Sequence, residues 1–80
     1  MPQLDYDRNV VNAEFDVNVG ANIRMRRLAL GRTQQQVADA AGMDVTKLSR
    51  VECGQRGLTF REGLAVAWAL RISPRSLARS

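Results

Sequence analysis

Apolar residues recur along the chain at intervals of three and four, which is the spacing of residues on one face of an α-helix. The first such stretch covers residues about 18–30 and ends at Gly31, a residue type common just beyond helix C-termini. The side chains that share its inward face are Val19, Ile23, Arg27 and Leu30. This pattern predicts an amphipathic helix at the start of the folded part of the chain.

Two further short helices are predicted in close succession. Thr33 and Gln36 have the spacing of a capping box, which opens a helix that ends at Gly42. Asp44 is the predicted N-cap of the next helix, which ends at Gly54. Their inward residues are Val37, Ala38 and Ala41 in the first helix and Leu48 and Val51 in the second. Two helices joined by a three-residue turn with a glycine have the outline of a helix-turn-helix, which is also a common connection in helical bundles.

The C-terminal part of the chain predicts two more helices. Thr59 and Glu62 form a second capping box, which opens a helix running through Leu70. We expect its inner face to consist of Phe60, Leu64, Ala67 and Leu70. Ser73 followed by Pro74 has the pattern of a cap with proline at the first helical position, so a short last helix is predicted over about 74–79. No stretch shows the alternation of a strand, and the predicted fold class is all-α with five helices.

Composition narrows the possible functions. The chain has 80 residues, enough for one small domain, and it has no histidine and a single cysteine, Cys53. Catalytic triads, histidine metal sites and intrachain disulfides are therefore excluded, and we predict neither an enzyme nor a cofactor or metal. No apolar run approaches the roughly 20 residues of a membrane span. A lone thiol fits a reducing compartment, so a cytoplasmic protein without membrane contact is expected.

Charge divides the chain into two parts. Residues 1–16 hold one basic side chain against four carboxylates, a net charge of −3, whereas residues 17–80 hold eleven against four, a net charge of +7. We therefore predict an acidic N-terminal leader over 1–16 and a basic domain over 17–80. A strongly positive small domain usually binds a polyanion. The alternative is that its charges only keep the protein in solution. Eleven of the twelve basic residues are arginine, which suits phosphate groups and guanine edges.

The motifs in this basic domain resemble those of the phage repressor and Cro-like helix-turn-helix family. The match consists of Val19-Gly20-x-x-Ile23-Arg24-x-x-Arg27, Gly31-x-Thr33-Gln34-x-x-Val37-Ala38-x-x-Ala41-Gly42, Leu48-Ser49-Arg50-Val51-Glu52-x-Gly54 and Leu64-x-x-Ala67-x-Ala69-Leu70-x-Ile72-Ser73. The segment Arg56-Gly57-Leu58-Thr59 is also similar to the controller proteins of restriction–modification systems. The resemblance implies a compact repressor-like domain that binds double-stranded operator DNA, often as a dimer, with the third helix in the major groove.

The third predicted helix, about 45–53, offers a polar outer face. With Leu48 and Val51 inward, a period of about 100° per residue turns Thr46, Ser49, Arg50 and Cys53 outward and places Val45 and Lys47 on the flanks. On such a face, Arg50 suits a bidentate contact with guanine, Thr46 or Ser49 a hydrogen bond to a base, and Val45 a thymine methyl group. The alternative is an ordinary solvated helix face. Nothing in the sequence indicates an activated thiolate at Cys53.

Other residues are assigned to supporting roles. Gln34 lies in the first turn of the second helix, where free backbone N–H groups favour an anion, and the resemblance implies a phosphate contact there. Thr33 is the cap beside it. Arg32 and Arg56 lie in turns near the same surface and suit either phosphate contact or a solvated loop, and Arg32 stands where the family usually has an apolar residue. Arg27 and Glu52 fall on or beside inward helix faces, where an unpaired charge is costly, and the resemblance implies an ion pair between them.

Trp68 and the leader leave two functional hypotheses open. Trp68 is expected at the edge of the inner face, either covered by Tyr6, Phe15 or Val17 of the leader or forming a homodimer contact that suits a palindromic operator. The leader itself is either one or two extra helical turns or an acidic arm that weakens nonspecific DNA binding. We predict a sequence-specific, homodimeric transcriptional regulator. The alternative is a protein-interaction module of the antitoxin type, in which DNA binding is secondary and a partner protein is held by the leader and Trp68.

Overall fold

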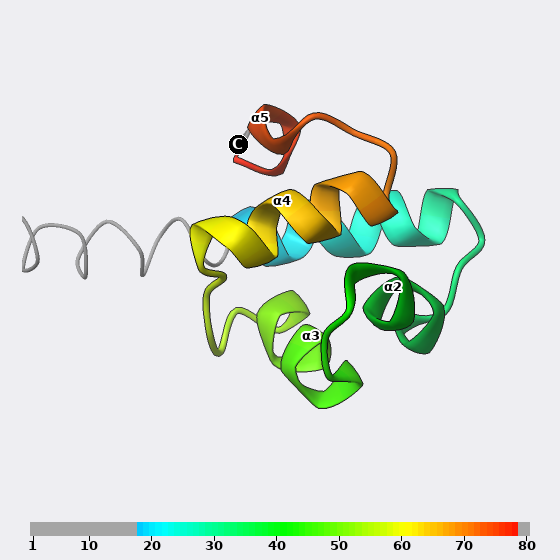
Figure 1. The fold of residues 1–80 in the computed structure, drawn as a ribbon, viewed down its shortest axis with the longest axis horizontal. Helices are drawn as coiled ribbons and strands as arrows, with labels where there is room; N and C mark the ends of the chain where they lie inside the picture. The colour runs from blue at the N-terminus through cyan, green and yellow to red at the C-terminus, as the bar shows by residue number, and fades with distance from the viewer. Residues whose placement is uncertain (1–17, 79–80) are drawn as a thin grey trace, which may run out of the picture.

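The computed structural model describes residues 18–78, and within this range the chain forms five helices and no strand (Figure 1). Residues 18–29 are the described part of the first helix. It is followed by α2 (Gln34–Ala41), α3 (Val45–Glu52), α4 (Phe60–Ala69) and α5 (Pro74–Leu77). The all-α fold class predicted from the sequence is therefore confirmed. The predictions made for the leader, residues 1–16, lie outside the described residues.

The starts of three helices follow the predicted capping residues. Thr33 and Thr59 each close a capping box, with Gln36 and Glu62 as the reciprocal partners. Asp44 caps α3 by accepting a hydrogen bond from the Thr46 N–H group. Ser73 occupies the N-cap position of α5, but its side chain makes no capping hydrogen bond and instead lies 3.3 Å from the hydroxyl oxygen of Ser76. Proline at the first position of α5 has no N–H group, which removes one of the donors that a helix start leaves unsatisfied.

The ends of the first four helices share one geometry. Each is followed by a residue with positive φ, in chain order Gly31, Gly42, Gly54 and Arg71. At the end of α4, the N–H groups of Arg71 and Ile72 donate to the carbonyls of Trp68 and Ala67, as in a Schellman motif. Arg71 adopts a φ of 59° there without the conformational freedom of glycine. Ile72, directly after it, packs against the core.

The core is small and continuous. α4 crosses the middle of the molecule, with α2 and α3 on one side and α5 on the other (Figure 1). The largest fully buried side chains come from four helices and from the residue that follows α4, and they are Ile23, Leu48, Leu70, Val37, Val51 and Val66. All the residues predicted to face inward from the first three helices are buried or half-buried. The packing of these side chains fixes α3 against α2 and α4.

The predicted inner face of α4 is only half correct. Ala67 and Leu70 are buried as expected, but Phe60 is 82% exposed and Leu64 is 42% exposed. Val66 and Ala69 fill the core in their place. The helix is apolar on most of its circumference, so the spacing of its largest side chains gave the wrong face. The buried face of α4 is therefore formed by Val66, Ala67 and Ala69, together with Leu70 just beyond the helix.

Trp68 is likewise further out than predicted. It is 74% exposed, so it lies outside the core rather than at the edge of the inner face. Phe60, Leu64 and Trp68 follow one another at intervals of four and share one exposed side of α4, which we call the α4 apolar face. Contiguous exposed apolar side chains on a soluble domain are typical of an interaction surface.

Side-chain hydrogen bonds tie the first helix to the C-terminal helices. Arg26 Nε donates to the carbonyl oxygen of Leu70 at 3.0 Å, which satisfies an acceptor just beyond α4. Asn22 Nδ2 donates to the carbonyl oxygen of Leu77 at 2.8 Å and does the same for α5. No helix within residues 18–78 is long and apolar enough to cross a membrane.

Candidate nucleic-acid interface

The outer face of α3 has the composition that the sequence predicts. Thr46 and Arg50 are exposed and lie four residues apart, with the half-buried Ser49 beside them. Val45 and Lys47 are half-buried on the two flanks, and Cys53 is an exposed free thiol just beyond the helix. On the opposite side, Leu48 and Val51 are completely buried. Thr46 and Arg50 are exposed as predicted, whereas Ser49 is half-buried and Val45 packs partly against the core; the contacts of these residues with bases remain predictions.

The turn between α2 and α3 fixes where α3 begins. Gly42 has a φ of 69°, and Met43 packs against the core directly after it. Asp44 then accepts a hydrogen bond from the Thr46 N–H at 2.7 Å. This backbone hydrogen bond, with further contributions from Thr46 and Lys47, lowers the pKa of Asp44 below its usual value. The charged cap therefore stabilises the first turn of α3 at neutral pH.

A buried ion pair fixes the other end of α3. Arg27 Nε donates to Glu52 Oε2 at 2.8 Å and Arg27 Nη2 donates to Oε1 at 3.0 Å, so the predicted pair forms with bidentate geometry. The side chains of Arg27 and Glu52 are only 11% and 2% exposed. The hydrogen bond to Glu52 raises the pKa of Arg27, against the opposing effect of burial. The Arg27 guanidinium is therefore charged at neutral pH.

Further bonds extend this pair into a network. Arg27 Nη1 donates to the carbonyl oxygen of Arg32 at 3.0 Å, and Gln34 Nε2 donates to Glu52 Oε1 at 3.0 Å. The network joins the first helix, the loop before α2, the first residue of α2 and the last residue of α3. α3 is thus held at both ends and packs on α2, and it exposes two polar residues one turn apart. This is the geometry of a unit that reads DNA.

Comparison with known proteins identifies this unit. The family described as helix-turn-helix domain matches residues 18–79. The chain belongs to the helix-turn-helix family. Its fold is similar to that of the restriction-modification controller protein C.AhdI from Aeromonas hydrophila, with 37% sequence identity over 78% of this chain and 94% of that chain and a TM-score of 0.75. No curated protein sequence matches significantly. The resemblance stated from the motifs is confirmed, and this helix-turn-helix protein is a DNA-binding regulator.

The residues predicted to contact phosphate do not all reach the same surface of the helix-turn-helix domain. Thr33 and Gln34 lie together at the start of α2, where Thr33 serves as the cap and Gln34 is bound to Glu52. Arg32 is half-buried and lines a groove that it shares with Trp68 and Arg71 rather than with α3. The structure therefore joins Gln34 to the α3 network and places Arg32 beside the end of α4.

Two other predicted DNA contacts of the helix-turn-helix domain share an acidic partner. Lys47 Nζ lies 2.8 Å from Glu62 Oε2, and Arg56 Nη1 lies 3.5 Å from Glu62 Oε1. Burial alone would raise the pKa of Glu62. The hydrogen bonds from Lys47 and from the Thr59 N–H, with the charges of Lys47 and Arg56, more than offset burial, so that the pKa of Glu62 is lowered. The carboxylate is therefore ionised at neutral pH beside both cations.

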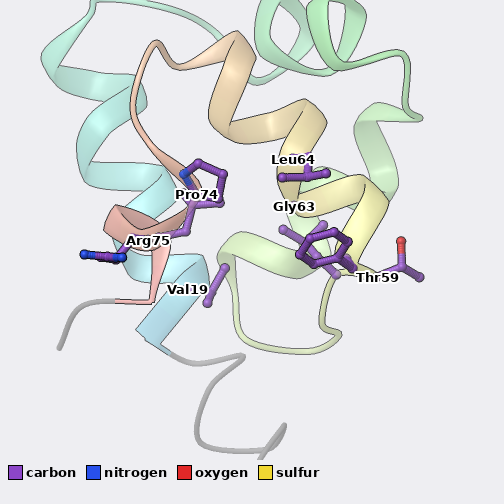
Figure 2. A pocket seen from close by; sticks show the side chains of 9 residues that line it. Val19, Thr59, Gly63, Leu64, Pro74 and Arg75 are labelled. Carbon is purple, nitrogen blue, oxygen red and sulfur yellow. The ribbon is translucent and has the colours of Figure 1, made fainter.

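An apolar groove lies on a different side of the helix-turn-helix domain (Figure 2). It has a volume of about 290 Å³ and runs between the first helix, the start of α4 and α5. Val19, Gly63, Leu64 and Pro74 line it, with Arg75 at one end (Figure 2). Phe60 and Leu64 belong both to this groove and to the α4 apolar face, so the two form one continuous apolar surface.

Two residues with a clear structural role were missed by sequence reasoning. A Cβ atom at Gly20 would overlap the carbonyl oxygen of Val51, so the first helix can approach the end of α3 only with glycine at this position. An isolated glycine inside a predicted helix can indicate that another backbone approaches closely. The signal is not specific, because Gly63 is also an isolated helical glycine and has open space around it. Glu62 was assigned only to a capping box, because no local pattern connects it to Lys47, fifteen positions earlier.

Proposed function

We propose that this protein binds operator DNA with α3 in the major groove and thereby regulates transcription. The observation that carries the proposal is the outer face of α3, where Thr46 and Arg50 are exposed on a helix held at both ends by Asp44 and the Arg27–Glu52 pair. A helix supported in this way can keep its side chains in register with base edges. The similarity to C.AhdI supports a regulator of the restriction–modification controller type.

Arg50 is the proposed main determinant of sequence choice. Its planar guanidinium suits the N7 and O6 acceptors of guanine, and the structure leaves it exposed at the centre of the outer face. Thr46 and Ser49, on the same face, are proposed to donate or accept single hydrogen bonds with neighbouring bases. Val45 is proposed to contact a thymine methyl group from the flank.

Contacts to the DNA backbone are proposed at the start of α2. Gln34 and Thr33 lie where the free N–H groups of the helix N-terminus attract a phosphate. Because Gln34 also donates to Glu52, a phosphate bound there would be linked directly to the end of α3. Arg32 is proposed to contribute long-range attraction rather than a fixed contact, since it lies beside Trp68 and Arg71.

A homodimer on a palindromic operator is proposed through the α4 apolar face. Phe60, Leu64 and Trp68 are exposed, and the face continues into the apolar groove of Figure 2, so a second copy can bury both. The face belongs to α4 and not to α3, so a dimer formed through it is proposed to leave both α3 helices available for DNA. The alternative, an antitoxin-type module, would use the leader and Trp68 to hold a partner protein, with DNA binding secondary, and predicts that a second chain co-purifies with this one.

The remaining parts of the proposal follow from DNA binding. A regulator of this kind acts where the DNA is, which supports a cytoplasmic location in a bacterial or phage-infected cell. The family supports a binding function rather than catalysis. We also propose that residues 1–16 are an acidic leader separate from the domain over 17–80, as the division of charge indicates.

Selection of bound sequences from random double-stranded DNA tests the proposal. The expected result is one enriched motif made of two inverted half-sites whose centres lie about one helical turn, roughly 10 base pairs, or a multiple of it apart. Arg50→Lys is the matched control, because it keeps the positive charge but lacks the planar guanidinium that can donate two hydrogen bonds to one guanine. It is expected to retain affinity and to lose preference at one base pair of each half-site. A wild-type protein that enriches no sequence at moderate salt contradicts the proposal.

A further inference from the structure

Glu62 is placed where it can control the charge that α3 presents to DNA. It is the third residue of α4 and closes the capping box by accepting the Thr59 N–H at 2.9 Å through Oε1. Its other oxygen, Oε2, accepts a hydrogen bond from Lys47 Nζ at 2.8 Å. One carboxylate thus serves the start of α4 and holds the only lysine in the chain, which projects from a flank of α3.

Arg56 completes this cluster from the loop between α3 and α4. Its Nη1 atom lies 3.5 Å from Glu62 Oε1, close enough for an ion pair but without hydrogen-bond geometry. Within the described residues this Nη1 atom is buried without any hydrogen-bond partner. A buried donor without a hydrogen-bond partner is costly, and the ion pair with Glu62 offsets part of that cost. We call Lys47, Arg56 and Glu62 the Glu62 cluster.

The accessibility of the cluster matters for DNA binding. The side chains of Lys47 and Arg56 are 38% and 35% exposed, whereas that of Glu62 is 20% exposed. Parts of both cationic side chains are therefore open to a phosphate, whereas the carboxylate is less exposed and is paired with each of them. A phosphate that took either cation from Glu62 would leave a partly buried carboxylate close to DNA, where like charges repel.

From this geometry we propose that Glu62 holds Lys47 and Arg56 back from the DNA backbone and so limits sequence-independent binding. This inference rests on the proposed DNA-binding function and adds a restraint to it. The cations remain paired with Glu62 in the complex, and they do not add to the number of phosphates that the protein neutralises. Affinity for nonspecific DNA is therefore lower than the count of basic residues around α3 suggests.

The substitution Glu62→Gln separates the effect of the negative charge of Glu62 from its role in the capping box. Glutamine also closes a capping box, so the start of α4 is retained while the cations are released. The probe is a double-stranded oligonucleotide of unrelated sequence, titrated with the full chain at salt concentrations between about 50 and 200 mM. Two released cations are expected to steepen the slope of log K against log salt by up to about 1.8, at roughly 0.9 per phosphate contact. Nonspecific affinity at low salt is expected to rise accordingly.

Asp39→Asn is the matched control. Asp39 on α2 is exposed and accepts a hydrogen bond from Gln35 at 2.7 Å, and no cation is paired with it among the described residues. The substitution changes the net charge by the same amount as Glu62→Gln but releases no basic side chain. We expect its salt slope to stay close to that of the wild type. Helix content measured by circular dichroism confirms that each variant is folded.

Lys47→Gln/Arg56→Gln provides a second, independent measurement. If Glu62 already holds both cations back, removing them leaves the wild-type slope nearly unchanged, and adding Glu62→Gln to this background produces no steepening. A Glu62→Gln slope no steeper than that of Asp39→Asn overturns the inference, as does steepening that persists without Lys47 and Arg56. A wild-type protein that binds no DNA at any salt concentration contradicts the proposed function instead, so the two failures are distinguishable.

Discussion

Arg27 and Glu52 form a bidentate ion pair that joins the first helix to the last residue of α3. The two hydrogen bonds measure 2.8 and 3.0 Å, and the Glu52 side chain is almost completely buried. Because Gln34 donates to the same carboxylate, the start of α2 is held by it as well. The pair is therefore a positioning device: neither side chain is available to contact a base, yet together they set the angle at which α3 projects.

Removal of one member of this pair is expected to be more harmful than removal of both. Arg27→Met leaves the Glu52 carboxylate buried without its partner, which should lower the free energy of unfolding by about 3 kcal/mol. Arg27→Met/Glu52→Met removes the buried charge and should lose less than the single variant. Urea denaturation of both variants and the wild type measures these values. A double variant less stable than Arg27→Met contradicts this interpretation of the pair.

Gly20 is expected to be required for the position of α3. In Gly20→Ala the new methyl group meets the Val51 carbonyl, and the overlap should exceed the gain in helix propensity, with a net loss of about 1–3 kcal/mol. Gly63→Ala is the matched control, because nothing lies within 4 Å of its added Cβ atom. It should be neutral or stabilise the fold by up to about 1 kcal/mol. Thermal unfolding of both variants checks the contrast, and equal effects at the two sites would contradict it.

Arg71 is expected to store strain that glycine relieves. Its φ of 59° is unfavourable for a residue with a Cβ atom, so Arg71→Gly should raise the free energy of unfolding by roughly 0.5–1 kcal/mol. Arg71→Ala removes the same charged side chain without relieving the backbone and should give no such gain. Denaturant titration separates the two effects. Equal stabilisation by glycine and alanine would show that the side chain, rather than the backbone, is responsible.

Trp68 is expected to affect assembly more than folding. Because it is 74% exposed, Trp68→Ser should leave the free energy of unfolding of the monomer within about 0.5 kcal/mol of the wild type. Sedimentation equilibrium should show weaker self-association, accompanied by lower affinity for a palindromic operator. Met25→Ser is the control, since Met25 is similarly exposed at 69% but lies on the first helix. A wild-type chain that remains monomeric at high concentration would contradict the proposed homodimer.

Local rules account for the helix boundaries, which the sequence predicts well. Thr33, Asp44 and Thr59 cap helices because their side chains reach backbone N–H groups two or three residues ahead. The ends at Gly31 and Gly42 follow in the same way from a left-handed residue. These signals involve neighbours in the chain and need no knowledge of the packing.

Packing between distant segments is what the sequence leaves open. On α4, Phe60 and Leu64 have the spacing of a core face, yet Val66 and Ala69 are buried instead. Because α4 is apolar on most of its circumference, the face that packs inward depends on the neighbouring helices and not on the local spacing. The Lys47–Glu62 contact likewise joins residues on different helices, and no spacing of residues within either helix predicts it. The Arg27–Glu52 pair was predictable because both charges interrupt apolar faces and the family motif contains both.

The most direct test of α3 as the element that reads DNA is the binding free energy of three proteins on the selected operator and its single-base-pair variants. Wild type, Arg50→Ala and Arg50→Lys are compared at one salt concentration. Both substitutions should remove about 1–3 kcal/mol of discrimination at one base pair of each half-site, while preference at the other positions persists. If both variants keep the wild-type preference at every position, Arg50 does not read the sequence and the proposal that it is the main determinant of sequence choice is contradicted.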